Sequence, residues 1–137
     1  MGTATPFRLR APRVAELPLH QQIAAVLSLE LAPPGRVSKY GVVWFSIDIA
    51  AYSGSAPGLR TSRGVVAGIP DIAAIYQGRA HHLEVKAPDG ELSLPQQSVA
   101  TSLLIAGARY AVVRDAREAL AALDEWGIPR ARRVNGL

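Results

Sequence analysis

Two short apolar runs on either side of a tight turn constrain the fold of this chain more than any other feature. The runs cover residues 71–76 and 80–87, and residues 77–79 between them read Gln-Gly-Arg, which is typical of a β-hairpin. Alternate side chains of a strand point to the same face, so Glu84 and Lys86 share a face. The sequence therefore predicts a hairpin that carries charged side chains inside an otherwise apolar sheet.

The length of the turn decides where Asp71 lies. A two-residue turn that begins at Gln77 sets Asp71 opposite Glu84, whereas one that begins at Gly78 sets Asp71 opposite Lys86. Both arrangements put the three charged side chains on one face, and a three-residue turn would move Asp71 to the other face. Two carboxylates and an ammonium group at one sheet edge suit a hard divalent cation and a phosphodiester.

The spacing of these residues resembles a known nuclease motif. Pro70-Asp71 followed by Glu84-Val85-Lys86 resembles the core of the PD-(D/E)XK nucleases. Further residues make roughly 17–130 similar to the virus-type replication-repair nuclease (VRR-NUC) family: Gly64 to Asp71, Gly78-Arg79, Leu83 to Ala87, Gly90, Leu92-Ser93, Gln96, Gly107-Ala108 and Trp126 to Ile128.

The resemblance implies both a fold and an activity. The implied fold is α/β, a restriction-endonuclease-like core of order α-β-β-β-α-β with a mixed central sheet flanked by helices. The implied activity is a DNA endonuclease that depends on Mg²⁺ or Mn²⁺. Some family members act as dimers on branched DNA, so four-way-junction DNA and a homodimer are expected partners.

The same resemblance assigns roles within the site. Asp71 and Glu84 would hold the metal together with the backbone carbonyl of Val85. Lys86 would position or deprotonate the attacking water and offset charge on the phosphorus. Gln96 would orient the water or the phosphate, although it also fits a capping box with a serine three residues earlier.

The first helix departs from the superfamily pattern, which often places an acidic residue there. Glu16 lies just before the predicted helix, and the segment from His20 to Gln22 is the nearest match within it. The departure leaves open whether His20 or Gln22 contributes to the site. It also keeps two alternatives open: a non-catalytic DNA-binding module with a degraded site, and an assembly protein in which the charged residues form a structural ion-pair network.

Composition favours an anionic partner. The chain has 137 residues, a formal charge of +4 and a pI of about 10.0, and it contains no cysteine, which excludes disulfides and thiolate metal sites. We expect residues 1–17 to be a flexible basic segment, 18–129 the nuclease-like domain and 130–137 a basic tail. The candidate DNA-binding residues are Arg60, Arg63, Arg130, Arg132 and Arg133. Neither a membrane span nor a secretory signal is evident, so a cytoplasmic location is expected.

The remaining elements follow from periodicity and capping residues. Helices are predicted over 19–31, from Ser93 to about residue 106, and from Asp115 to about residue 126; strands are predicted over 42–49 and 109–114. Within the second hairpin strand, His82 is expected on the face of Glu84 and His81 on the other. The rings of Trp44, Trp126 and Tyr110 are interpreted as core residues.

Overall fold

The structure is a computed structural model that describes residues 16–47 and 62–131. Its elements follow the predicted order. They are α1 (Glu16–Glu30), β1 (Val42–Ser46), β2 (Ile72–Tyr76), β3 (Arg79–Val85), α3 (Leu94–Ile105), β4 (Arg109–Val113) and α4 (Ala116–Glu125). The strands form one mixed sheet of order β1-β2-β3-β4, in which β3 and β4 are parallel and the other neighbours antiparallel. The expected α/β class with a mixed central sheet is confirmed.

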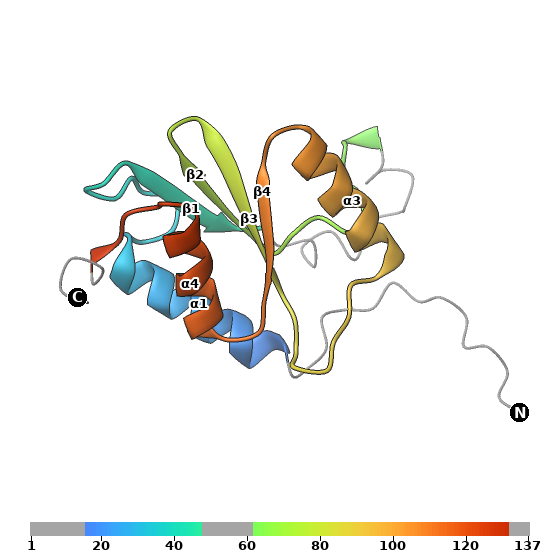
Figure 1. Ribbon diagram of the computed structural model, residues 1–137, viewed down its shortest axis with the longest axis horizontal. Coiled ribbons are helices and arrows are strands. Elements are labelled where there is room, and N and C mark those ends of the chain that lie inside the picture. The colour runs from blue at the N-terminus through green and yellow to red at the C-terminus, as the bar shows by residue number, and fades with distance from the viewer. Residues whose placement is uncertain (1–15, 48–61, 132–137) are drawn as a thin grey trace, which may run out of the picture.

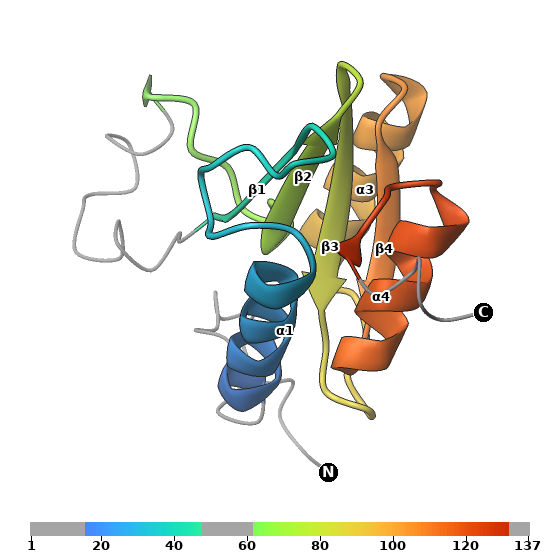
Figure 2. The same ribbon diagram turned by 90° about the vertical axis from the view of Figure 1, so that its left-hand side faces the viewer.

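The helices cover both faces of the sheet. Figures 1 and 2 show α1 and α4 next to each other on one face, with α3 on the opposite face. The hydrophobic core lies under α1 and α4, where strand residues such as Trp44, Leu83 and Val85 meet helix residues such as Ile23 and Leu123. Because alternate strand residues face this core, the residues between them point toward the side of α3.

The hairpin between β2 and β3 resolves the open question about the turn. Gln77 and Gly78 have φ angles of 50° and 74°, the left-handed conformation that a two-residue type I′ turn requires. Tyr76 therefore pairs with Arg79, which is the register of a turn that begins at Gln77. Continued by one residue beyond Ile72 and Leu83, this register sets Asp71 opposite Glu84.

The helix ends are capped as the sequence predicts. The Ser93 hydroxyl accepts from the Gln96 amide at 3.2 Å, and the Ser93 amide donates to the Gln96 side-chain oxygen at 2.9 Å, which completes the capping box of α3. Asp115 accepts from the Glu118 amide at 2.7 Å at the start of α4. Two boundaries differ from the prediction: α1 begins at Glu16 rather than residue 19, and β1 ends at Ser46, with residues 48–49 outside the described part.

Arg130 corrects the predicted boundary between domain and tail. Its guanidinium donates to Glu30 at 2.9 Å and to both carboxylate oxygens of Asp124 at 2.9 Å. It therefore joins the C-terminal ends of α1 and α4, and its side chain is only 14% exposed. The folded unit thus includes Arg130 instead of ending at residue 129.

None of the helices in the described part of the chain is both long and apolar enough to cross a membrane.

Candidate metal and phosphodiester site

Asp71 and Glu84 meet where β2 begins and β3 ends. The Val85 amide donates to the Asp71 carboxylate at 2.8 Å. The pairing of β2 with β3 ends at Ile72 and Leu83, so beyond it this carboxylate accepts the hydrogen bond that a backbone carbonyl would accept within the sheet. The amide and carbonyl of one strand residue project toward the same neighbouring strand, so the Val85 carbonyl also faces the side of Asp71. Glu84 is only 2% exposed. The structure thus brings the carboxylates of Asp71 and Glu84 together, in one of the registers that the sequence left open, and their role in metal binding stays a prediction.

The electrostatics of Glu84 follow from this placement. Burial is the largest cause that raises its pKa, followed by a hydrogen bond with Asp71 and the negative charge of Asp71, and together they raise the pKa to about 10. Lys86 acts in the opposite direction, and Glu16 adds a further small increase. In the absence of a cation, burial and Asp71 thus both favour the protonated form of Glu84.

Lys86 lies on the same face, one residue beyond the end of β3, and is 9% exposed. The turn after it packs against its side chain, because a Cβ on Gly90 would stand 3.5 Å from the Lys86 Cδ. Arg114, the residue after β4, holds that turn by donating to the Gly90 carbonyl at 2.8 Å. No ion pair within 4.0 Å joins Lys86 to Glu84, although both belong to the described residues. The ammonium is thus buried near the carboxylates without direct contact.

Glu16 belongs to the first helix, although the sequence predicts a helix that begins at residue 19. It is the first residue of α1, is buried, and lies close enough to Glu84 for its charge to influence the pKa of Glu84. Its position could have been found from the helical period, because residue 16 precedes the buried Ile23 by seven and Leu27 by eleven. The predicted start at residue 19 left it outside the helix.

The two residues expected from the first helix lie elsewhere. The His20 ring lies 3.0 Å from the Ser46 hydroxyl of β1, and Gln22 is exposed. No contact in the described part of the chain joins either residue to Asp71 or Glu84, whereas the charge of Glu16 acts on Glu84.

Gln96 lies at a helix start that packs against the segment before Asp71. Gly68, with φ of 90°, approaches this start so closely that a Cβ would stand 2.5 Å from the Pro95 carbonyl carbon and 2.8 Å from the Gln96 nitrogen. The side-chain oxygen of Gln96 accepts from Ser93, so its capping role is confirmed. Its catalytic role stays a prediction that concerns the remaining amide nitrogen.

Among the residues that the structure describes, three polar atoms on this face are shielded from solvent and have no hydrogen-bond partner: Glu84 Oε1, His82 Nδ1 and the Tyr110 hydroxyl oxygen. His82 shares the face of Glu84, as predicted, whereas His81 packs against Trp126 on the core side with ring centroids 5.2 Å apart. Trp44 lies in the core as expected. Tyr110 was wrongly interpreted as a core residue, because its register places it beside His82 on the side of α3.

The donor set fits a magnesium-like cation. Within residues 16–47 and 62–131 no cluster of three or more His, Asp or Glu side chains stands close enough to hold a metal ion. Mg²⁺, however, is commonly bound by one or two carboxylates and keeps several waters. Asp71, Glu84 and the Val85 carbonyl supply that type of set, and the unpartnered Glu84 oxygen is a ligand atom that the protein itself leaves unused.

The arginines proposed for DNA binding fall into three groups. Arg130 is committed to Glu30 and Asp124, so its predicted role as a phosphate contact is replaced by a structural one. Arg63 is an exposed residue just after the undescribed stretch. The other candidates lie outside the described residues: Arg60, Arg132 and Arg133.

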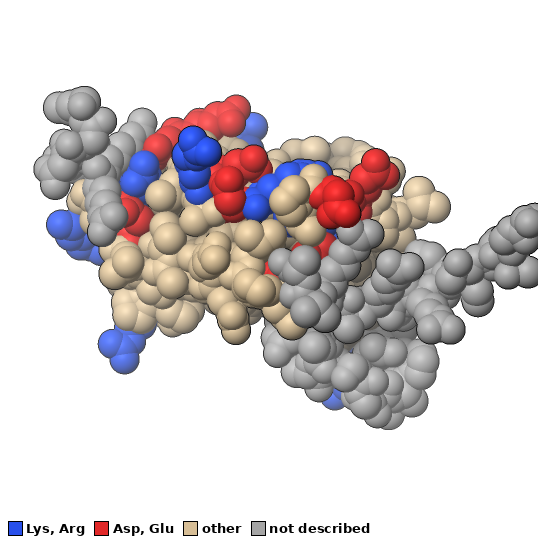
Figure 3. Space-filling view, turned by 90° about the horizontal axis from the view of Figure 1, so that it is seen from below, with Lys and Arg blue, Asp and Glu red and all other residues tan. Residues whose placement is uncertain are grey.

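Charge is unevenly divided between the described part and the rest of the chain. The described residues contain nine Lys and Arg against ten Asp and Glu, which gives them a formal charge of −1. The whole chain has a formal charge of +4, so the remaining residues have a formal charge of +5. On the face in Figure 3, acidic and basic side chains are interspersed in one band rather than gathered in a basic patch. The described part of the chain therefore has no net positive charge that would attract an anionic partner.

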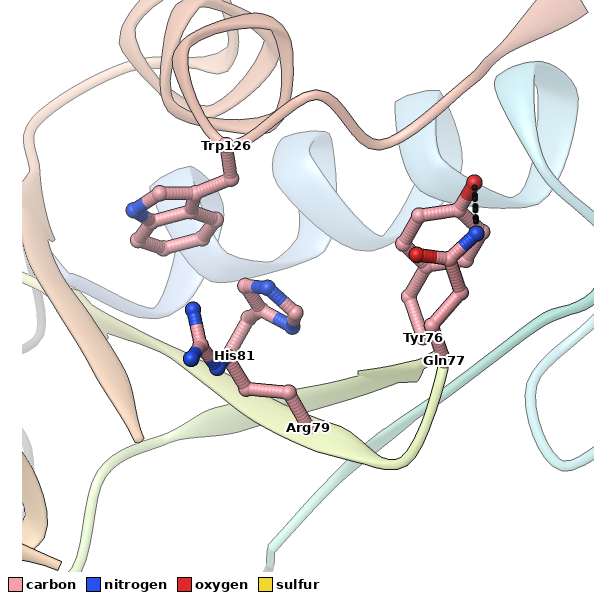
Figure 4. Close-up of a pocket in the computed structure, with 5 residues that line it drawn as sticks. All are labelled: Tyr76, Gln77, Arg79, His81 and Trp126. Atoms are coloured by element: carbon pink, nitrogen blue, oxygen red, sulfur yellow. Dashed lines mark hydrogen bonds between the residues drawn. The ribbon is translucent and has the colours of Figure 1, made fainter. Parts of the chain in front are cut away.

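A cavity of about 290 Å³ lies at the other end of the hairpin, lined by Tyr76, Gln77, Arg79, His81 and Trp126 (Figure 4). Its strand residues face the core side, and the length of β2, about 17 Å for five residues, separates it from Asp71. It belongs to a different end and face from the carboxylates and contributes nothing to the candidate site.

Compared with known proteins, the chain matches no family model, no curated protein and no solved structure. The VRR-NUC resemblance therefore stays a prediction that rests on the residues that carry it.

Proposed function

We propose that this protein is a Mg²⁺- or Mn²⁺-dependent DNA endonuclease built on a PD-(D/E)XK-like core. The observation that carries the proposal is the Glu84 carboxyl group, which is buried against Asp71 and has an oxygen without a partner. Burying an acid next to another acid destabilises the fold, and a divalent cation between them would remove that conflict.

The alternative of a structural ion-pair network finds less support. Such a network needs Glu84 and Lys86 in contact, and no ion pair within 4.0 Å joins them. The alternative of a degraded site rested on a missing acidic residue in the first helix, and Glu16 now supplies a carboxylate near Glu84. Both observations favour the nuclease.

In this proposal the residues divide the work of phosphodiester hydrolysis. A bound Mg²⁺ or Mn²⁺ supplies positive charge at the phosphate and makes water a better nucleophile. Asp71 and Glu84 provide the negative charge that holds the cation, and the hydrogen bond from the Val85 amide fixes the orientation of Asp71. Lys86, held by the packing of Gly90, neutralises charge that develops on the phosphate oxygens or receives a proton from the attacking water.

The experiment is a cleavage assay on linear, flapped and four-way branched DNA with Mg²⁺, Mn²⁺ or EDTA. We expect metal-dependent cleavage by the wild type and a loss of about 100-fold or more in Asp71→Asn and Glu84→Gln. Glu91→Gln is the matched control, because Glu91 is an exposed acid in the turn after Lys86. Binding without cleavage under every metal condition would contradict the proposal and favour a DNA-binding module. Cleavage by both variants at the wild-type rate would overturn the site assignment.

A homodimer belongs to the same proposal, because cutting both strands of a duplex benefits from a two-fold axis. Light scattering with and without branched DNA would test it, and a monomer in both conditions would exclude it.

A further inference from the structure

Tyr110 and His82 stand side by side on the sheet face that carries Glu84. They are directly paired residues of β4 and β3, and Glu84 follows His82 by two positions on the same face. Side chains related in this way on a sheet face have Cβ atoms roughly 5–8 Å apart, so their polar ends can converge on one point. Burial raises the pKa of the Tyr110 hydroxyl, and the charges of Glu84 and Asp71 raise it further, which places the phenol in their electrostatic reach.

The unpartnered atoms of this group complement one another. The Tyr110 hydroxyl can donate, the neutral His82 nitrogen or Glu84 oxygen can accept, and none of the three has a partner in the protein. A water buried in a protein typically makes about three hydrogen bonds to otherwise unsatisfied groups. One shared water would satisfy all three atoms.

We propose that Tyr110 is a positioning residue of the metal site, which orients the Glu84 carboxylate through a water shared with His82. The inference rests on the proposed function in so far as Glu84 is a metal ligand. Ligating carboxylates are generally held by outer hydrogen bonds, and losing such a partner weakens metal affinity by about 10–100-fold. Tyr110 does not itself touch the metal or the substrate.

The test is calorimetric titration of the intact protein with Mn²⁺ in the absence of DNA. In Tyr110→Phe we expect the Mn²⁺ dissociation constant to rise by about 10–100-fold. The melting temperature of the metal-free variant should change little, because the hydroxyl has no protein partner among the described residues and phenylalanine fills the same space. Tyr76→Phe is the matched control, since the Tyr76 hydroxyl lies at the far end of the hairpin and bonds to Gln77. A dissociation constant within twofold of the wild type would overturn the inference.

A double variant tests the shared water. If Tyr110 and His82 act through the same molecule, Tyr110→Phe combined with His82→Leu should bind Mn²⁺ no more weakly than the weaker single variant. Additive losses would refute the shared water.

The outcomes separate this inference from the proposed function. A wild type that binds Mn²⁺ but cleaves no DNA would overturn the nuclease alone, since the role of Tyr110 is measured by affinity. A wild type that binds no Mn²⁺ would overturn both.

Discussion

Replacing Glu84 by glutamine should make the metal-free protein more stable, by an amount that depends on pH. The carboxyl group titrates near pH 4.5 in the unfolded chain and near 10 in the folded protein, because of burial and Asp71. A raised folded pKa means that the folded state binds the proton more tightly. Between the two values, unfolding releases a proton, so the stability of the wild type falls as pH rises.

The free-energy cost of keeping Glu84 protonated at pH 7 depends only on how far pH 7 lies above the pKa of Glu84 in the unfolded chain, because its pKa in the folded protein is well above 7. Keeping Glu84 protonated at pH 7 then costs about 3 kcal/mol, and at pH 5.5 about 1 kcal/mol. Glutamine has the shape of the protonated acid and can also donate to Asp71, but it has no such cost. Glu84→Gln should therefore be about 3 kcal/mol more stable at pH 7, equivalent to about 10 °C in melting temperature.

The assay is urea denaturation in EDTA at pH 5.5 and pH 7 for the wild type, Glu84→Gln and the control Glu91→Gln. The control should behave as the wild type at both values, because Glu91 is exposed. Saturating Mn²⁺ should stabilise the wild type, by about 2.7 kcal/mol at 100 times its dissociation constant, but not Glu84→Gln. A variant no more stable than the wild type at pH 7, or a gain that is equal at both pH values, would refute the reasoning.

Three further predictions test the surroundings of the site. Gly68→Ala should destabilise the protein by roughly 2–5 kcal/mol, because the new Cβ would stand 2.5 Å from the Pro95 backbone at a φ of 90°. The control Gly78→Ala, at a φ of 74° but with no atom within 4 Å of its Cβ, should cost only about 1–2 kcal/mol. Equal losses of stability in urea denaturation would contradict the close approach of Gly68 to Pro95. Gln96→Glu should keep the capping box, so its stability should stay within about 0.5 kcal/mol of the wild type. DNA cleavage by this variant should slow, because a negative charge is added to the site. Full activity with Mg²⁺ would mean that Gln96 serves only as a helix cap. Arg130→Ala should lower the free energy of unfolding by about 3 kcal/mol, because it leaves the buried Glu30 without this partner. The salt dependence of DNA binding should stay unchanged in this variant. A flatter salt dependence at wild-type stability would instead support a role of Arg130 in DNA binding.

The hairpin and the caps were predictable because their determinants are local. The sequence places the hairpin at residues 77–79 but leaves the exact turn open. The turn at Gln77 and Gly78 in the structure selects one of the expected registers, and counting from it sets Asp71 opposite Glu84. Ser93 and Asp115 lie next to the helix termini that they cap, and their spacing alone identifies them.

The features that were missed depend on contacts between distant segments. Tyr110 reaches His82 only through the register of two parallel strands joined by α3, which no turn residue sets. The charge of Glu16 acts on Glu84 only because α1 packs against the sheet. Arg130 pairs with Glu30, 100 positions earlier in the chain, so a basic residue that reads as part of a solvated tail is part of the fold.

The same atoms account for the instability of the metal-free site and for its proposed chemistry. If Asp71, Glu84 and Lys86 served the fold alone, contact between Lys86 and Glu84 would be the stabilising arrangement, and apolar side chains would do as well. Instead, burial and Asp71 raise the pKa of Glu84, one Glu84 oxygen has no partner among the described residues, and no ion pair within 4.0 Å joins Lys86 to Glu84. A divalent cation would replace the proton, bind the unused oxygen and remove the repulsion between the carboxylates in one step. A stabilisation by Mn²⁺ that the wild type shows and Glu84→Gln lacks would therefore distinguish a metal site from an unfavourable burial of two acids that binds no cation.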